Sequence, residues 1–156
     1  MYNFSIEISD KIAKSFEEKL KVSSELGINN IETSEIINGK ELYKMTGEEH
    51  EAIRDLLIDY GKRIVLLSTN LEMSDKENLN LLFRKALVLN VKGIKINPKE
   101  NDDLTYVKKL SKSYSIPLLI ENNSKTFINN ENTMLDLIKD SEKAGLVFNP
   151  FEFVCM

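Results

Sequence analysis

Short apolar segments alternate along this chain with longer segments in which apolar residues recur every three or four positions. Short runs bounded by turn residues indicate buried strands, and the longer period indicates amphipathic helices. Leu79, Leu82, Phe83, Ala86 and Leu89, for example, share one face of a helix. The pattern predicts six strands with a helix in each gap between them. The predicted strands are 3–8, 30–35, 63–69, 93–97, 116–122 and 145–149.

Polar residues mark where the predicted helices begin. In a capping box, a Ser or Thr and a Glu three residues later each accept a hydrogen bond from the other's backbone N–H. The boxes pair Ser15 with Glu18, Thr46 with Glu49 and Ser74 with Glu77. Further helices are expected to begin near 102–103 and near 129–130. Three glycines suit the left-handed position that ends a helix: Gly27, Gly61 and Gly145.

Regular alternation of strand and helix predicts a parallel α/β sheet, because each strand–helix unit has the size of a parallel crossover. Right-handed crossovers then place the carboxyl ends of all strands at one edge. Two architectures satisfy six such strands: a partial (β/α)8 barrel and an open, doubly wound sheet of the flavodoxin type. No linker or break in composition divides the chain, so residues 1–156 are predicted to form one domain.

Composition narrows the class of protein. The formal net charge of −4 argues against binding to a phosphate backbone, which needs clustered Lys and Arg. The single cysteine, Cys155, excludes an intramolecular disulfide and a thiolate metal cluster, and it suits a reducing compartment. The N-terminus carries no signal-peptide pattern, and no apolar stretch has the length of a membrane span. We therefore expect a cytoplasmic protein without nucleic-acid or membrane partners.

Candidate chemistry lies at the ends of the predicted strands, because ligands of α/β folds bind outside the carboxyl ends of parallel strands. Glu121 ends the fifth strand and Asn149 ends the sixth. Lys95 and Asn97 end the fourth strand, and polar groups in such positions suit the recognition of ligand hydroxyl groups. They equally suit capping of the helix that follows, and Glu32 equally suits a solvated strand end or an ion pair with Lys95.

Several segments resemble the xylose isomerase-like sugar isomerase/epimerase family, part of the AP endonuclease 2-type superfamily. The segments follow in order along nearly the whole chain: residues 25–32 (ELGINNIE), 59–69 (DYGKRIVLLST), 119–122 (LIEN) and 145–150 (GLVFNP). The resemblance implies a TIM barrel, which usually has about 250 residues. On this basis the chain is expected to form the first six strands of such a barrel and to lack the last two.

The resemblance also implies functional residues. In that family a divalent metal (Mn, Mg, Co or Zn) sits at the carboxyl mouth of the barrel, and Glu121 corresponds to a metal ligand with a catalytic role. Asn149 stands where the family has a ligating Asp, and Glu152 stands where it has a substrate-binding His. Glu32 corresponds to a residue that contacts the sugar. Two further ligands belong to the missing strands.

With these departures, the resemblance implies a sugar or sugar phosphate isomerase or epimerase that is degenerate or incomplete. A cation held by one carboxylate and one neutral amide keeps most of its water and binds weakly. A non-catalytic module that forms homo-oligomers through open barrel edges is the alternative. The single histidine, His50, lies in a predicted helix away from the strand ends, so it is not expected to be catalytic. A lone histidine also argues against the zinc-dependent endonuclease IV type.

Overall fold

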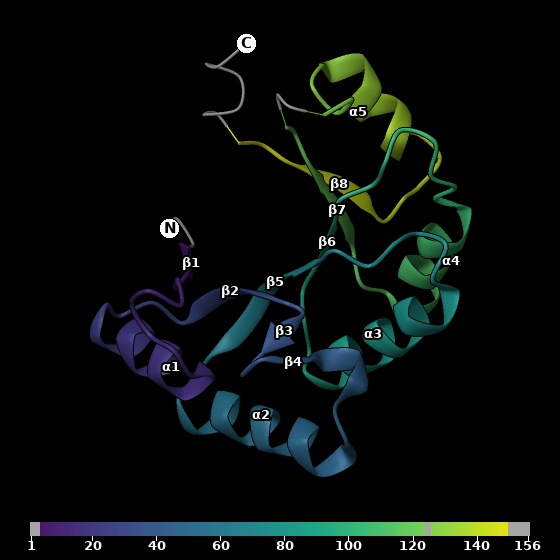
Figure 1. Ribbon diagram of the computed structural model, residues 1–156. Helices are drawn as coiled ribbons and strands as arrows, with labels where there is room; N and C mark the ends of the chain where they lie inside the picture. Colours follow the sequence, from purple (N-terminus) through teal and green to yellow (C-terminus); the bar gives the residue numbers. More distant parts are fainter. Residues whose placement is uncertain (1–3, 124–125, 150–156) are drawn as a thin grey trace.

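Six parallel strands form one curved sheet in the computed structural model, which describes residues 4–123 and 126–149 (Figure 1). The strands follow one another across the sheet in the order β1-β2-β5-β6-β7-β8, and every neighbouring pair is parallel. Their bounds are β1 Ser5–Glu7, β2 Asn30–Ser34, β5 Arg63–Thr69, β6 Ile94–Ile96, β7 Leu118–Glu121 and β8 Ala144–Val147.

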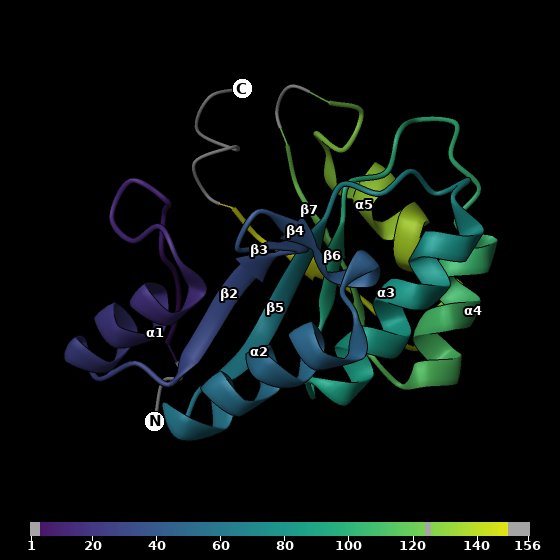
Figure 2. The same cartoon turned by 60° about the horizontal axis from the view of Figure 1, so that its bottom comes forward.

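The order of the strands decides between the two predicted architectures. A doubly wound sheet reverses direction at a switch point, whereas these strands advance in one direction only. Because crossovers share one hand, all the helices then lie on one face of the sheet. Figures 1 and 2 show them along the outside of the curve. The partial-barrel prediction is confirmed, and the flavodoxin-type alternative is wrong. The helices are α1 Phe16–Glu25, α2 Gly47–Asp59, α3 Lys76–Val88, α4 Thr105–Tyr114 and α5 Glu131–Ile138.

The hydrophobic core lies between the outer face of the sheet and the helices. Side chains alternate along a strand, so Ile94 and Ile96 of β6 face the helices and are fully buried. The face predicted for the third helix is confirmed: Leu79, Leu82, Phe83 and Ala86 are inaccessible to solvent, and Leu89 is nearly so. None of the helices in the described part of the chain is long and apolar enough to cross a bilayer.

The inner face of the sheet is predominantly polar. Most of its side chains are exposed or half-buried, which contrasts with the inaccessible positions between them, although Leu66 beside Glu32 is buried. A predominantly polar face of this kind can meet water at a small hydrophobic cost. The inner positions include Ser5, Glu7, Asn30, Glu32, Ser34, Ser68, Lys95, Leu119 and Glu121.

Two of the predicted helix starts are confirmed as complete capping boxes, at Ser15 and at Thr46. The third is wrong, because Asp75 and not Ser74 caps α3. The Asp75 carboxylate accepts hydrogen bonds from the backbone N–H and the side-chain amide of Asn78. Aspartate is as good an N-cap as serine, so either Ser74 or Asp75 could cap this helix. The backbone geometry decides between them.

Four helices, α1 to α4, end with the same backbone pattern. After α1, for instance, Ile28 N–H bonds to the Ser23 carbonyl while Gly27 takes a positive φ of 69°. Gly61 does the same after α2, which confirms both glycine predictions. Gly145 was predicted wrongly, since it lies inside β8 and pairs with Leu119. After α3 and α4 the left-handed residues are Asn90 and Ser115.

The sequence did not predict a small hairpin beyond β2. Strands β3 (Ile36–Ile37) and β4 (Lys40–Glu41) pair antiparallel and lead into a short 3-10 helix, η1, at Leu42–Lys44. Only two residue pairs form the hairpin, which is too short for a period of two to stand out. Its position at the carboxyl end of β2 places it at the mouth of the sheet (Figure 2).

Candidate site at the mouth of the curved sheet

Three of the residues singled out in the sequence come together at the carboxyl ends of β6, β7 and β8. Lys95 Nζ lies 2.6 Å from Glu121 Oε2, and Asn149 Nδ2 donates to Glu121 Oε1 at 3.0 Å. Lys95 and Glu121 are largely buried, with 18% and 25% of their side chains exposed. The Glu121 carboxylate therefore accepts a hydrogen bond on each oxygen, one of them from a cation.

Asn122 fixes the segment that carries Asn149. Its side-chain amide donates to the Asn149 carbonyl at 2.9 Å, and its side-chain oxygen accepts from the Asn149 backbone N–H at 2.6 Å. Asn122 is buried, so this reciprocal pair is shielded from water. In the sequence, Asn122 is notable only as the last residue of a predicted strand. Asn122 and Glu121 are adjacent in the strand and therefore point to opposite faces of the sheet. This alternation could have indicated that Asn122 has an internal partner, because a polar residue on the buried face of a strand needs one.

A second chain of hydrogen bonds runs across the mouth from β2 to β6. Glu35, buried just after β2, accepts from the Thr69 hydroxyl and from the Asn70 backbone N–H, the latter at 3.0 Å. The Asn70 side-chain oxygen then accepts from Asn97 Nδ2 at 2.9 Å. Glu35 thus holds the loop after β5 against Asn97.

A cavity of about 630 Å³ opens beside Glu121. The loops after β6, β7 and β8 form its walls, with Asn97, Asn122, Phe127 and Asn149 among the lining residues. A volume of this size suits a small organic ligand. Polar groups from three strands face it together with one aromatic ring, which is a mixture suited to hydroxylated molecules.

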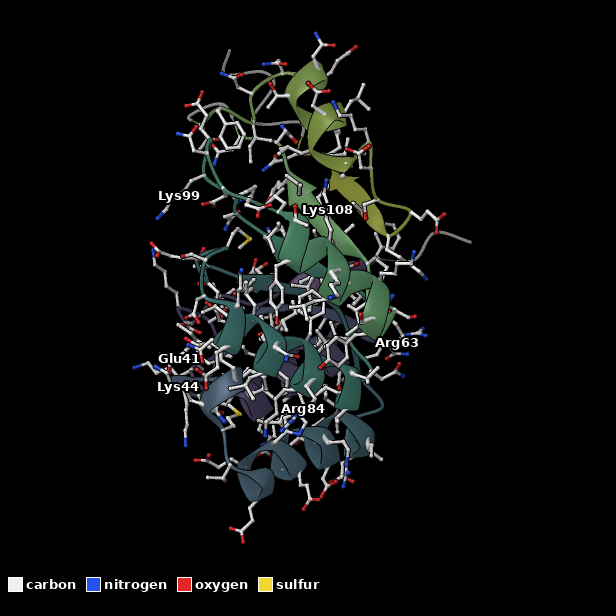
Figure 3. All side chains as sticks on the ribbon, turned by 90° about the vertical axis from the view of Figure 1, so that its right-hand side faces the viewer. Glu41, Lys44, Arg63, Arg84, Lys99 and Lys108 are labelled. Atoms are coloured by element: carbon white, nitrogen blue, oxygen red, sulfur yellow. The ribbon has the colours of Figure 1, made fainter. Side chains whose placement is uncertain are left out.

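Lys99 extends from the same rim into solvent (Figure 3). It pairs with Glu72 at 2.7 Å, and both side chains are mostly exposed. The hydrogen bond from Lys99 lowers the pKa of Glu72, and the bond to Glu72 raises the pKa of Lys99. In the part of the chain that the structure describes, the mouth therefore carries two ion pairs between a lysine and a glutamate, one sheltered and one exposed.

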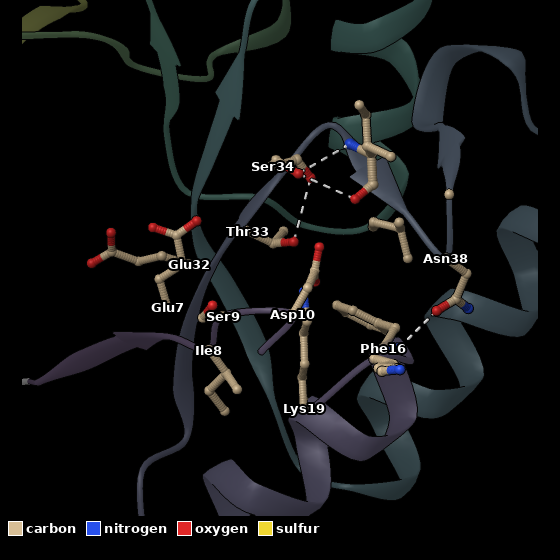
Figure 4. Close-up of a pocket in the computed structure, with 14 residues that line it drawn as sticks. Glu7, Ile8, Ser9, Asp10, Phe16, Lys19, Glu32, Thr33, Ser34 and Asn38 are labelled. Carbon is tan, nitrogen blue, oxygen red and sulfur yellow. Dashed lines mark hydrogen bonds and ion pairs between the residues drawn. The ribbon is translucent and has the colours of Figure 1, made fainter. Parts of the chain in front are cut away.

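The structure places Glu32 in a separate cleft, between β1, β2 and the loop that leads into α1 (Figure 4). This cleft has a volume of about 510 Å³ and also contains Glu7, Lys14 and Lys19. Glu32 Oε1 accepts a hydrogen bond from the Ser5 hydroxyl at 2.6 Å, so its partner is not Lys95, as one reading of the sequence had it. The predicted site residues therefore form two groups at the same edge of the sheet.

The residues around Glu121 do not fit a divalent metal. Of Lys95, Glu121 and Asn149, Glu121 alone is a carboxylate, and the ammonium group of Lys95 already lies against it. Asn149 turns its N–H2 and not its carbonyl oxygen toward Glu121. Within residues 4–123 and 126–149, no three His, Cys, Asp or Glu side chains lie close enough together to hold a metal ion.

His50 lies away from this mouth, as expected. Its ring is buried between α2 and α3, where Nε2 lies 3.0 Å from the Lys85 carbonyl oxygen. Burial lowers the pKa of His50, because the charged imidazolium loses its hydration. The neutral ring is a packing element here. Glu152, the predicted substrate-binding residue, and Cys155 lie outside the described residues.

Comparisons with known proteins find similarity in structure and not in sequence. No family model and no curated protein matches the chain. A xylose isomerase-like TIM barrel protein from Mycobacterium smegmatis in complex with magnesium superposes with a TM-score of 0.64 and 17% identity over 84% of this chain. A sugar phosphate isomerase/epimerase from Parabacteroides distasonis gives 0.60 and 14% over 99%, and an AP endonuclease, family 2, from Brucella melitensis gives 0.67 and 14% over 94%.

These similarities establish the fold. The chain spans 55% of the Mycobacterium smegmatis protein, 67% of the Brucella melitensis protein and 71% of the Parabacteroides distasonis protein. The resemblance found in the sequence is confirmed at this level, since the structural neighbours are xylose isomerase-like and sugar phosphate isomerase/epimerase barrels.

Proposed function

We propose that this chain binds a small polyhydroxylated ligand, a sugar or sugar phosphate, at the mouth of its curved sheet and is related in function to sugar isomerases and epimerases. The observation that carries the proposal is the convergence of Lys95, Glu121 and Asn149 from three neighbouring strands beside a cavity of suitable size. The structural neighbours of the same fold support the class of ligand.

The polar groups offer a ligand alternating donors and acceptors. A hydroxyl group both donates and accepts, so a pair of neighbouring hydroxyls can bond to a carboxylate and to an ammonium or amide at once. Glu121 supplies the acceptor, and Lys95 and Asn97 supply donors. In this proposal Glu32 contacts a more distant part of the ligand from its own cleft, and Glu152 remains a predicted binding residue.

Isomerisation or epimerisation needs a base that removes a proton beside a carbonyl group. Glu121 is the proposed base, because it is a strand-end carboxylate that lines the cavity and is held by Lys95 and Asn149. The resemblance assigns two further metal ligands to two strands beyond the sixth. We therefore propose binding as the primary activity of the chain and expect any turnover by it alone to be slow.

The proposal is tested by a thermal-shift screen of aldoses, ketoses and their phosphates against the purified chain. A compound that raises the unfolding temperature should lose this effect in Glu121→Gln and in Asn97→Leu. Glu72→Gln, at the exposed rim, is the matched control and should keep it. If no sugar or sugar phosphate stabilises the chain at millimolar concentration, the proposed function is wrong.

A specific observation favours a second candidate, an assembly module. Among the described residues, β1 pairs only with β2 and β8 pairs only with β7, which leaves the outer edge of each strand open. Open edges favour pairing with another chain, and a homo-oligomer is the expected product. Light scattering coupled to gel filtration distinguishes this candidate. A dimer that persists at low concentration and binds no sugar would support assembly over ligand binding.

A further inference from the structure

We propose that the Lys95 ammonium takes the place of a divalent cation at this mouth, so that the site works without a metal. The inference concerns the same site as the proposed function, but it rests on the cation chemistry of the chain's own residues and not on the identity of the sugar.

The lone pairs of Glu121 are already partly used in hydrogen bonds. A ligating carboxylate must direct its oxygens at the metal, whereas both oxygens of Glu121 already accept hydrogen bonds. Lys95 Nζ bonds to one at 2.6 Å and Asn149 Nδ2 bonds to the other at 3.0 Å. A metal ion held by both oxygens could bind only after both bonds were broken, and one held by a single oxygen would lie beside the ammonium or the amide.

The net charge of the residues around Glu121 also disfavours a divalent ion. Magnesium and similar hard cations prefer several oxygen ligands with negative charge. The charges of Glu121 and Lys95 cancel, and Asn149 is neutral. The cluster of these three residues therefore presents no net charge to an incoming ion. A divalent ion at Glu121 would also lie against the ammonium of Lys95. Like charges in direct contact repel strongly where water is partly excluded.

The ammonium is held in place by the sheet. Lys95 is the middle residue of β6, and it pairs with Ser68 on one side and with Leu119 on the other. Asn149 is likewise fixed by its reciprocal bonds to buried Asn122. The backbones on both sides of the carboxylate are thus anchored, which makes the ammonium and amide a built partner of Glu121 and not an incidental surface contact.

Titration with MnCl2 tests the inference without any sugar. Isothermal titration calorimetry should find no saturable binding to the wild-type chain below about 1 mM. The double variant Lys95→Met/Asn149→Asp removes the ammonium and supplies a second carboxylate, and it should bind Mn²⁺ about tenfold more tightly or better. Adding Glu121→Gln to that variant should abolish the gain. Lys99→Met/Asn149→Asp, which spares Lys95, is the matched control and should gain less.

Two outcomes would overturn the inference. One is micromolar Mn²⁺ binding by the wild-type chain that Glu121→Gln removes. The other is a folded double variant that binds Mn²⁺ no better than the wild type, because Lys95 would then not be what keeps the metal out. If circular dichroism shows that Lys95→Met does not fold, Lys95→Gln in the Asn149→Asp background replaces it. This variant keeps a donor to Glu121 but removes the charge, and the same two criteria apply.

The proposed function and this inference can fail separately. A sugar that stabilises the chain equally before and after dialysis against EDTA supports both. A sugar that stabilises it only after metal is restored supports ligand binding and overturns the inference. If no sugar binds, the proposed function fails, while the Mn²⁺ titration still decides the inference.

Discussion

Breaking the ion pair between Lys95 and Glu121 should destabilise the fold by an amount that the structure allows us to estimate. Two unit charges roughly 4 Å apart attract by about 4 kcal/mol at an effective dielectric constant of about 20. Desolvation of both partners and the entropy of fixing the lysine, up to about 2 kcal/mol, offset more than half of this attraction. With only 18% and 25% of the two side chains exposed, little of the remainder is lost to screening. We expect a coupling energy of about 1–2 kcal/mol.

A double-mutant cycle measures this coupling. The variants are Lys95→Met, Glu121→Gln and the two combined, and the measured quantity is the free energy of unfolding in urea. The chain has no tryptophan, so far-ultraviolet circular dichroism is the appropriate probe. The double variant should be more stable than the sum of the two single effects predicts, because each single variant leaves a partly buried charge without its partner.

The exposed pair of Lys99 and Glu72 provides the control. Its nitrogen–oxygen distance of 2.7 Å is almost the same, but 72% and 64% of the two side chains are exposed. The corresponding cycle should show no coupling above experimental error, since solvent and salt screen such pairs. Equal coupling energies for the two pairs would refute the reasoning, as would no coupling between Lys95 and Glu121.

Further predictions concern stability at three other positions. Glu35→Gln should cost about 2 kcal/mol in urea unfolding, because the amide has one acceptor oxygen for the two donors, the Thr69 hydroxyl and the Asn70 N–H, that the carboxylate accepts from; an unchanged midpoint would contradict the role assigned to Glu35. Burial lowers the pKa of His50 in the folded chain, so the unfolded chain takes up the proton first and stability should fall as pH drops through about 6.5. His50→Gln should remove that part of the pH dependence, and a persistent slope would contradict it. Asp75→Ala should cost about 1 kcal/mol as a lost N-cap, whereas Ser74→Ala should leave the unfolding midpoint unchanged; the reverse result would restore the capping box.

The local pattern of apolar and polar residues accounts for where the helices and strands form. The amphipathic face of α3 and the capping boxes at Ser15 and Thr46 were all visible in the chain, because each depends on residues within one or two helical turns. The errors at Ser74 and Gly145 have the same local origin. Either of two neighbouring residues can cap a helix, and glycine suits a strand as well as a turn when a leucine from the next strand packs over it. Leu119 does so at Gly145.

The candidate site was predicted only in part. Glu121, Asn149, Lys95 and Asn97 were identifiable as polar ends of strands, and parallel strands bring such ends to one edge. Their partners could not be read from the chain, because a hydrogen bond across 26 residues depends on sheet register and on side-chain direction. One reading of the sequence offered Glu32 as the partner of Lys95. Register placed Glu32 two strands away, beside Ser5.

The sequence by itself determined the six strands of the sheet, the five helices between them, their order along the chain and the polar residues at the strand ends, since these depend on periodicity along the chain. Tertiary structure decided that the strands advance in one direction around a curve, with every helix outside and a polar face within. It also decided that an ammonium and an amide occupy both oxygens of Glu121. The physical reason is that strand order and cross-strand pairing come from contacts between distant residues, whose energies no local pattern contains.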